Sequence, residues 1–335
     1  MCVATYPGVD RDRRERSSLG ALALGVGLAA SFTVVGLLIA TAGAAPPIQE
    51  ATTPKTAWVL SGGGSLGAVQ VGMLAELIAE GVRPDFIVGV SAGALNGAFL
   101  AHNPCADTVT RMATLWSEIT TREVLRLSWR STLGMLGLRD HVASAQGLRN
   151  LLLRELPYRS FSESSITLHL VCTDLITGEE VVISAGEVIE AVIASTAIPG
   201  VFPSVLYQGR HLVDGAVSAS TPISVAVRLG ATRVIVLPCG FACATNTIPK
   251  RPWGRAMHAI TLMGARQLLR DFEHFSQSII VSIAPPVCPL DQSSYDYSNG
   301  AKLIARARES TRQWLDKDGL ACHDFPAQLT IHSHR

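Results

Sequence analysis

A serine between two glycines is the first feature of this sequence that points to chemistry. Gly89, Ser91 and Gly93 form a G-x-S-x-G pattern that follows the apolar run 86–90 and precedes a segment of small residues. This pattern is typical of a sharp strand-to-helix turn, where neither flank leaves room for a side chain. The hydroxyl then lies at a helix N-terminus, whose N–H groups favour developing negative charge. The pattern predicts a nucleophilic serine, with an N-cap serine in a glycine-rich helix start as the alternative.

A run of glycines precedes the serine motif in the chain. Gly62, Gly63, Gly64 and Gly67 belong to the sequence GGGSLG, which follows a short apolar run. As G-x-G-x-x-G it could bind a dinucleotide, but the acidic residue expected about 20 residues later is poorly matched, because Asp85 precedes its strand. Bare glycine backbone can instead direct N–H groups at the oxygen of a tetrahedral intermediate. Its place just ahead of the serine motif favours this oxyanion hole over nucleotide binding or a merely tight turn.

Asp214 is the third candidate, in the tripeptide Asp214-Gly215-Ala216 that follows the apolar triplet 211–213. Asp-Gly is a common turn dipeptide, so by itself it predicts only a turn. Its significance comes from the order of the three motifs along one chain: glycine run, serine, aspartate.

These motifs, together with the stretch 194–203 ahead of the aspartate, resemble the patatin-like phospholipase family over residues 55–238. The resemblance implies Ser91 as the nucleophile and Asp214 as its only catalytic partner, with no cofactor and no metal. An exposed carboxylate has a pKa of about 3.9 and is a weak base for an alcohol, so burial and a short hydrogen bond must assist it.

The same resemblance places an oxyanion hole at the backbone N–H groups around Gly63 and Gly64. The whole set of candidate oxyanion residues is Gly62, Gly63, Gly64 and Gly67. The other residues of the matching motifs are Gly89, Gly93, Gly215 and Ala216.

The implied function is hydrolysis of lipid acyl esters through an acyl-enzyme intermediate, with a lipid or phospholipid substrate and a membrane surface as partners. Two positions depart from the family's usual pattern: Leu66 stands where Arg or Lys is usual, and Ser61 where Asp or Gly is frequent. Loss of the cation weakens the inference to phospholipid head groups. An acyltransferase that uses the same acyl-serine and a non-catalytic lipid-binding or scaffold domain remain alternatives.

A conventional Ser/His/Asp triad is a further alternative, because His258 and His274 follow Asp214 in the chain. The order of elements argues against it: the glycine run and the serine motif fall on the first two strands here, whereas an α/β-hydrolase places both later.

Apolar residues flank the predicted site and indicate a hydrophobic acyl groove, although burial in the core is the competing explanation for most of them. They are Ala94, Leu95, Ala98, Phe99, Leu100, Ile198, Val201 and Phe202.

Short apolar runs alternate with segments of helical spacing, which predicts an α/β fold of three layers: a largely parallel central sheet, helices on both faces, and an N-terminal hydrophobic helix. The expected strands are 57–60, 86–90, 166–173, 180–183, 234–238 and 279–283. The expected helices are 66–78, 91–101, 108–127, 147–155, 188–195, 256–275 and 300–315, with Gly81 as a left-handed cap after the first.

The chain has 335 residues, of which 48% are hydrophobic and 16% charged, enough for one domain with a sizeable core. Its net charge of +1 gives no indication of nucleic acid as a partner. We expect a catalytic domain at 55–238, a helical and strand extension of the same domain at 239–316, and a tail at 317–335. The seven cysteines lack metal-site spacing, and Cys172 is expected to be a buried thiol. The sequence does not indicate an oligomeric state.

The N-terminal part has a different composition. A basic segment, 1–18, holds four arginines and precedes an uncharged stretch, 19–45, that is long enough to span a bilayer. This predicts a membrane protein with a single N-terminal anchor and the arginines on the inner side. A secretory signal cleaved within 40–44, which would export the domain, and a translation start further downstream remain alternatives.

Overall fold

The computed structural model describes residues 53–329 with gaps at 127, 240–249, 251, 291, 322–323 and 327–328. The chain divides into two compact units, Met1–Ala51 and Thr52–Arg335, and the described residues all belong to the second. The predicted basic segment 1–18 and anchor 19–45 therefore lie outside the described residues. Within the described ranges, no helix combines the length and the apolar character needed to cross a membrane.

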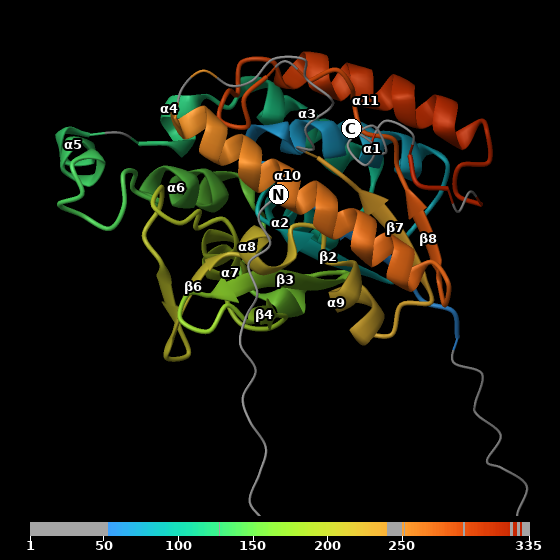
Figure 1. Ribbon diagram of the computed structural model, residues 1–335. Helices are drawn as coiled ribbons and strands as arrows, with labels where there is room; N and C mark the ends of the chain where they lie inside the picture. Colours follow the sequence, from blue (N-terminus) through green and yellow to red (C-terminus); the bar gives the residue numbers. More distant parts are fainter. Residues whose placement is uncertain are drawn as a thin grey trace, which may run out of the picture. The chain divides into compact units, whose positions relative to one another are not determined.

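A mixed, largely parallel sheet forms the centre of the second unit (Figure 1). Its strand order is β5-β6-β3-β2-β1-β7-β8, with β4 also paired to β3. The parallel strands are β1 (Thr56–Leu60), β2 (Phe86–Val90), β3 (Thr167–Asp174), β7 (Arg233–Leu237) and β8 (Ile280–Ile283). The antiparallel strands are β4 (Glu180–Ile183), β5 (Val205–Tyr207) and β6 (Arg210–Asp214).

Helices cover both faces of this sheet, because each buried strand sends alternate side chains into two separate apolar clusters. In β1, Trp58 packs into one cluster and Val59 into the other. The helices that contribute to the first cluster are α1 (Gly67–Ala79), α2 (Ala92–His102), α3 (Ala106–Glu118), α4 (Thr121–Val124), α6 (Gln146–Glu155), α7 (Val188–Ser195) and α11 (Gly300–Leu315). The helices of the second cluster are α8 (Ala216–Ala219), α9 (Ile223–Arg228) and α10 (Pro252–Phe275), the long helix that crosses the sheet in Figure 1.

The predicted three-layer α/β architecture is confirmed, and several elements match the expected bounds. The strands 86–90 and 180–183 and the helices 188–195 and 300–315 have the bounds that the sequence predicts. Gly81 has a φ of +74°, as expected for a left-handed residue after a helix. The thiol of Cys172 is free and buried, also as expected.

One expectation about the elements was wrong, and one hairpin was not predicted. The single helix expected over 108–127 is two helices, because α3 ends at Glu118 and Thr120 begins α4 (Thr121–Val124). Thr120 accepts the N–H of Glu123 while the Glu123 carboxylate accepts the N–H of Thr120, a capping box that starts a new helix. The hairpin of β5 and β6 was not expected as paired strands, because its segments are short and half exposed.

Candidate active site

Ser91 stands at the turn between β2 and α2 in a conformation that side chains rarely adopt, with φ 53° and ψ −119°. The two neighbouring glycines make this turn possible. A Cβ at Gly89 would lie 2.6 Å from the carbonyl oxygen of Gly93, and a Cβ at Gly93 would collide with the carbonyl oxygen of Leu60. The steric reason expected for the G-x-S-x-G pattern is therefore present at both flanks.

A short hydrogen bond joins Ser91 to Asp214. Ser91 Oγ donates to Asp214 Oδ2 at 2.6 Å, and the second carboxylate oxygen accepts the N–H of Ala216 at 2.8 Å. Both side chains are buried, with 5% of Ser91 and 3% of Asp214 exposed. In the described part of the chain, no histidine hydrogen-bonds to either residue, so His258 and His274 are not brought to this pair.

The sheet brings these two residues together although they are 123 positions apart. Ser91 follows Val90, which pairs with Val171 of β3, and the next residue of β3, Cys172, pairs with Asp214 of β6. Ser91 and Asp214 therefore lie at one level on either side of β3. Gly215 allows the chain to turn there, because a Cβ at this position would collide with the carbonyl oxygen of Val171.

Burial changes the acidity of Asp214. Removal from water raises the pKa of its carboxyl to about 6, and the hydrogen bonds from Ser91 and from the N–H of Ala216 counteract only part of that rise. A carboxylate with this pKa is a better proton acceptor than an exposed one, yet it is still largely ionised at neutral pH.

The glycine run divides into N–H groups that are used within the protein and N–H groups that are not. Gly62 donates to the carbonyl oxygen of Ser220 at 3.0 Å, and Gly67 donates to the carbonyl oxygens of Gly64 and Ser65. The N–H groups of Gly63 and Gly64 meet no acceptor among the described residues. Of the predicted oxyanion residues, Gly63 and Gly64 are thus the two with free donors.

Close packing explains why the run consists of glycines. A Cβ at Gly63 would lie 2.6 Å from Cys239 Sγ, and one at Gly67 would lie 2.6 Å from the ring of Trp116. Gly64 has a φ of +60° and lies beside the backbone of Ser294. Leu66 and Ser61, the two departures from the family pattern, are both buried.

A buried network of Gln70, Asn96 and Trp116, which the sequence analysis missed, holds the backbone at the start of the glycine run. Gln70 Nε2 donates to the carbonyl oxygens of Ser61 and Leu237, each at 2.9 Å. Asn96 Nδ2 donates to Gln70 Oε1 at 2.9 Å, and Trp116 Nε1 donates to Asn96 Oδ1 at 2.7 Å. Amide side chains inside otherwise apolar helices were the available signal, since such groups are buried only with partners.

Ser195 is a second residue that the sequence analysis did not single out. Its Oγ accepts the N–H of Ser91 at 3.0 Å and donates to the carbonyl oxygen of Val171 at 2.7 Å. Ser195 therefore fixes the backbone of the turn, and it lies in the stretch 194–203 that carried part of the resemblance.

A narrow, mostly apolar cavity opens at Ser91. Its volume is about 40 Å³, which is space for a few water molecules. Of the residues expected to form an acyl groove, Leu95, Ile198 and Phe202 line it. The other five are core residues that do not reach it: Ala94, Ala98, Phe99, Leu100 and Val201. For these five the competing explanation, burial in the core, was correct.

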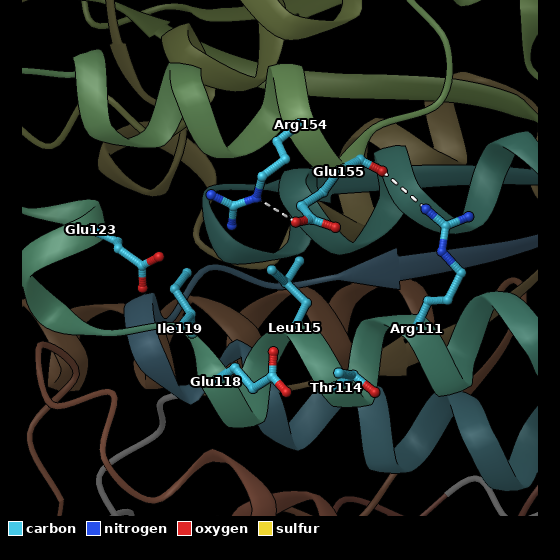
Figure 2. A pocket seen from close by; sticks show the side chains of 8 residues that line it. All are labelled: Arg111, Thr114, Leu115, Glu118, Ile119, Glu123, Arg154 and Glu155. Atoms are coloured by element: carbon cyan, nitrogen blue, oxygen red, sulfur yellow. Dashed lines mark hydrogen bonds and ion pairs between the residues drawn. The ribbon is translucent and has the colours of Figure 1, made fainter.

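A larger cavity of about 240 Å³ lies between α3, α4 and α6 (Figure 2). Ile119 lines both this cavity and the one at Ser91. Charged side chains dominate the larger cavity, and Arg154 Nε bonds to Glu155 Oε1 at 2.6 Å while Arg111 donates to the carbonyl oxygen of Glu155 at 3.2 Å. It offers no nucleophile beside a base. The described residues also hold no cluster of His, Cys, Asp and Glu suited to a metal ion.

Comparison with known proteins gives a consistent family match. The family model "Patatin-like phospholipase" matches residues 58–227. A patatin-like phospholipase domain-containing protein of Caenorhabditis elegans is 30% identical over 192 residues, which are 56% of this chain and 14% of that protein. Neuropathy target esterase sws of Drosophila melanogaster is 29% identical over 189 residues, 54% of this chain and 13% of the esterase. The chain thus spans only a small part of the length of these relatives.

Solved structures with similar chains were found at low identity. Human GIVD cytosolic phospholipase A2 in complex with methyl gamma-linolenyl fluorophosphonate is 12% identical, with a TM-score of 0.45 over 84% of this chain and 60% of the human chain. VipD from Legionella pneumophila is 14% identical, with a TM-score of 0.42 over 78% of this chain and 67% of that chain.

Proposed function

Since this chain belongs to the patatin-like phospholipase family, we propose that it hydrolyses lipid acyl esters with Ser91 as nucleophile and Asp214 as the only catalytic partner. The observation that carries the proposal is the 2.6 Å hydrogen bond from Ser91 Oγ to Asp214 Oδ2. It joins Ser91, whose backbone φ of 53° is unfavourable for a residue with a side chain, to a buried carboxylate of raised pKa. A purely structural pair would need neither the strain nor the burial.

In the first half of the reaction, Asp214 takes the proton from Ser91 as Oγ attacks the ester carbonyl carbon. The carbonyl oxygen becomes an oxyanion that accepts the N–H groups of Gly63 and Gly64. In support of this role, both N–H groups have no acceptor among the described residues, and Gly64 lines the cavity at Ser91. When the tetrahedral intermediate collapses, the ester C–O bond breaks and the proton on Asp214 passes to the departing alcohol. The acyl group remains on Ser91.

In the second half, water attacks the acyl-serine. Asp214 takes a proton from this water, the same N–H groups stabilise the second oxyanion, and Ser91 leaves with the proton returned by Asp214. The products are a fatty acid and an alcohol. An alcohol in place of water would give acyl transfer by the same steps, and the product analysis below distinguishes the two.

The substrate class follows from the walls of the cavity. Leu95, Ile198 and Phe202 offer an acyl chain apolar contact, and each buried CH₂ contributes about 0.8 kcal/mol. The cavity holds only a few water molecules, so side chains at its mouth must move before a long chain can enter. Leu66 is buried in the core and offers a head group no contact, which supports acceptance of neutral and zwitterionic lipids.

The experiment combines two measurements on the full chain. Rates for p-nitrophenyl esters should rise from acetate to medium-chain acyl groups, and a fluorophosphonate should label the protein covalently at Ser91. Ser91→Ala and Asp214→Asn should each lower kcat by a factor on the order of 10³ or more, and the double variant should be no slower than the singles. Ser278→Ala, whose exposed hydroxyl donates to the carbonyl oxygen of Phe275 at the end of α10, is the matched control that keeps both activity and labelling.

Three outcomes would count against the proposal. Retained hydrolysis in Ser91→Ala would show that Ser91 is not the nucleophile. Strictly additive losses in the double variant would show that Ser91 and Asp214 do not act as one unit. A flat or falling chain-length profile removes the lipid substrate but leaves a serine hydrolase. Analysis of products in the presence of an alcohol shows whether the acyl group goes to water or to the alcohol.

A further inference from the structure

Exposed apolar side chains gather around one segment that stands away from the body of the molecule. This segment, 126–144, contains α5 (Trp129–Met135), which protrudes at one side in Figure 1. Trp129, Leu136 and Leu138 are 73%, 68% and 70% exposed. Large apolar residues at this level of exposure on one short segment mark an interaction surface rather than a folding core.

The base of this segment is fixed to the walls of the Ser91 cavity. An antiparallel bridge between Arg126 and Ser144 closes it, and Ala143 donates its N–H to the carbonyl oxygen of Val201 at 2.8 Å. The loop that holds Val201 also supplies Ile198 and Phe202 to the cavity. Val124, just before the segment, lines the same cavity. The protruding segment therefore rises from the rim of the candidate active site.

Two strand turns at the carboxyl ends of the parallel strands also carry exposed apolar residues. β3 continues past the level of Ser91 into a turn with Leu175 and Ile176, which are 54% and 81% exposed. Leu206 of β5 is 67% exposed and pairs with His211 of β6. The carbonyl oxygen of His211 accepts the N–H of Leu175, which joins the two turns. At about 3.3 Å per residue, these turns project about 10 Å beyond Ser91.

We call the six exposed side chains on these three projections the apolar rim: Trp129, Leu136, Leu138, Leu175, Ile176 and Leu206.

Positive charge accompanies the part of the apolar rim that lies on segment 126–144. Residues 122–141 contain four arginines and two carboxylates. Glu123 is occupied in the capping box of α4, and Asp140 is bonded to His141 at 2.7 Å. Arg122, Arg126 and Arg139 are exposed. An aromatic and aliphatic tip flanked by arginines is the combination that binds an anionic lipid surface.

We propose that the apolar rim docks the protein on an anionic lipid bilayer, with the mouth of the Ser91 cavity facing the lipid. This inference rests on the proposed lipid-ester function for its purpose, although its test does not require catalysis. A second copy of the chain is a poorer occupant, because a two-fold contact would bring the like-charged arginines of both copies together. A bilayer with acidic head groups accepts both the apolar tip and the cations.

The docking predicts where Trp129 lies when the protein is on a vesicle. The full chain in its Ser91→Ala form, which leaves the lipid intact, is mixed with vesicles of phosphatidylcholine and phosphatidylglycerol that carry bromine on the acyl chains. Bromine quenches tryptophan fluorescence at short range. The fluorescence of the protein with all its tryptophans should therefore decrease on binding, because Trp129 is quenched, and Trp129→Phe should lack this decrease. Trp314→Phe, a tryptophan of α11, is the matched control and should keep it. This readout follows Trp129 itself, so any contribution of residues 1–52 to vesicle binding does not mimic it.

Changes in the apolar rim and its arginines give the quantitative test. Leu136→Ser with Leu138→Ser should lower the lipid affinity measured through Trp129 by about tenfold or more, because each leucine loses its apolar contact with lipid. Ile280→Ser, an exposed apolar residue at the amino end of β8 and thus at the opposite edge of the sheet, should leave it unchanged. Arg126→Glu with Arg139→Glu should weaken binding to vesicles with phosphatidylglycerol but not to phosphatidylcholine alone.

Equal quenching in Trp129→Phe and Trp314→Phe would overturn the docking proposal, and so would an unchanged affinity in the double leucine variant. Burial of Trp129 that depends on protein concentration without vesicles would assign the apolar rim to a second copy of the chain. Failure of the docking leaves hydrolysis of soluble p-nitrophenyl esters unaffected, whereas failure of the proposed function abolishes that hydrolysis and leaves the quenching in place.

Discussion

Replacing Asp214 by asparagine should abolish ester hydrolysis and, at pH 8, make the folded protein more stable. The folded protein raises the pKa of this carboxyl from 3.8 to about 6, chiefly by burial. Because the pKa in the folded state is the higher one, ionisation of Asp214 opposes folding: the cost is absent below about pH 4 and complete above about pH 6. At about 1.4 kcal/mol per pKa unit, it reaches about 3 kcal/mol.

Asparagine removes the charge and can keep both hydrogen bonds of Asp214. Its side-chain oxygen can accept the N–H of Ala216, and its amide group can donate to Ser91 Oγ. We therefore expect a free energy of unfolding that is about 1 to 3 kcal/mol higher than that of the natural protein at pH 8, and equal to it at pH 4. The assay is urea unfolding of both proteins at pH 4, 6 and 8, with p-nitrophenyl ester hydrolysis measured in parallel.

Asp271→Asn is the matched control. Asp271, on α10, also has a pKa raised to about 6, first by burial and then by the nearby charge of Glu180, but it lies outside the Ser91 site. Its replacement should stabilise the protein in the same pH range while hydrolysis continues. A natural protein that is more stable than Asp214→Asn at pH 8, or a difference that is the same at pH 4 and pH 8, would refute the reasoning.

The pKa of about 6 also predicts that kcat/KM of the natural protein falls tenfold per pH unit below about pH 6, because only ionised Asp214 accepts the serine proton; a pH–rate profile without this acid limb would contradict it. Gly93→Ala should lower the free energy of unfolding by about 3 kcal/mol, because its Cβ collides with the Leu60 carbonyl. Gly97→Ala on the same helix meets only side-chain atoms at 3.2 Å and should change it by no more than about 1 kcal/mol, which thermal unfolding of the two variants would measure. Burial raises the pKa of Glu76, but hydrogen bonds from two arginines of α11 outweigh this and lower the pKa. Glu76→Gln should therefore lower the free energy of unfolding by about 1 to 2 kcal/mol at pH 7, and urea unfolding should show that this difference fades below about pH 4.5.

Local sequence determined the turn that holds Ser91. An apolar run of five residues, two glycines around a serine and a small-residue helix specify a strand, a tight turn and a helix, because each depends on neighbours in the chain. The structure places the same elements there with the steric need for both glycines at Gly89 and Gly93. The buried strands and the helices with clear apolar spacing were predictable for the same reason.

Local pattern failed where a polar cap or an exposed strand set the structure. The break between α3 and α4 depends on reciprocal hydrogen bonds of Thr120 and Glu123, which apolar spacing does not register. The strands β5 and β6 are short and half exposed, so their pairing is decided by β3 rather than by their own residues.

Only the tertiary structure decided which partner Ser91 receives and in what state. The resemblance pointed to Asp214, but the 2.6 Å contact arises because β3 separates Ser91 and Asp214 by one strand, a register between segments 123 residues apart. The raised pKa of Asp214 likewise comes from the whole set of atoms that exclude water from it. Which glycine N–H groups remain free, at Gly63 and Gly64, depends on acceptors supplied by distant loops. A sequence specifies which groups are present, whereas their pKa values and their available hydrogen-bond donors depend on what the folded chain packs around them.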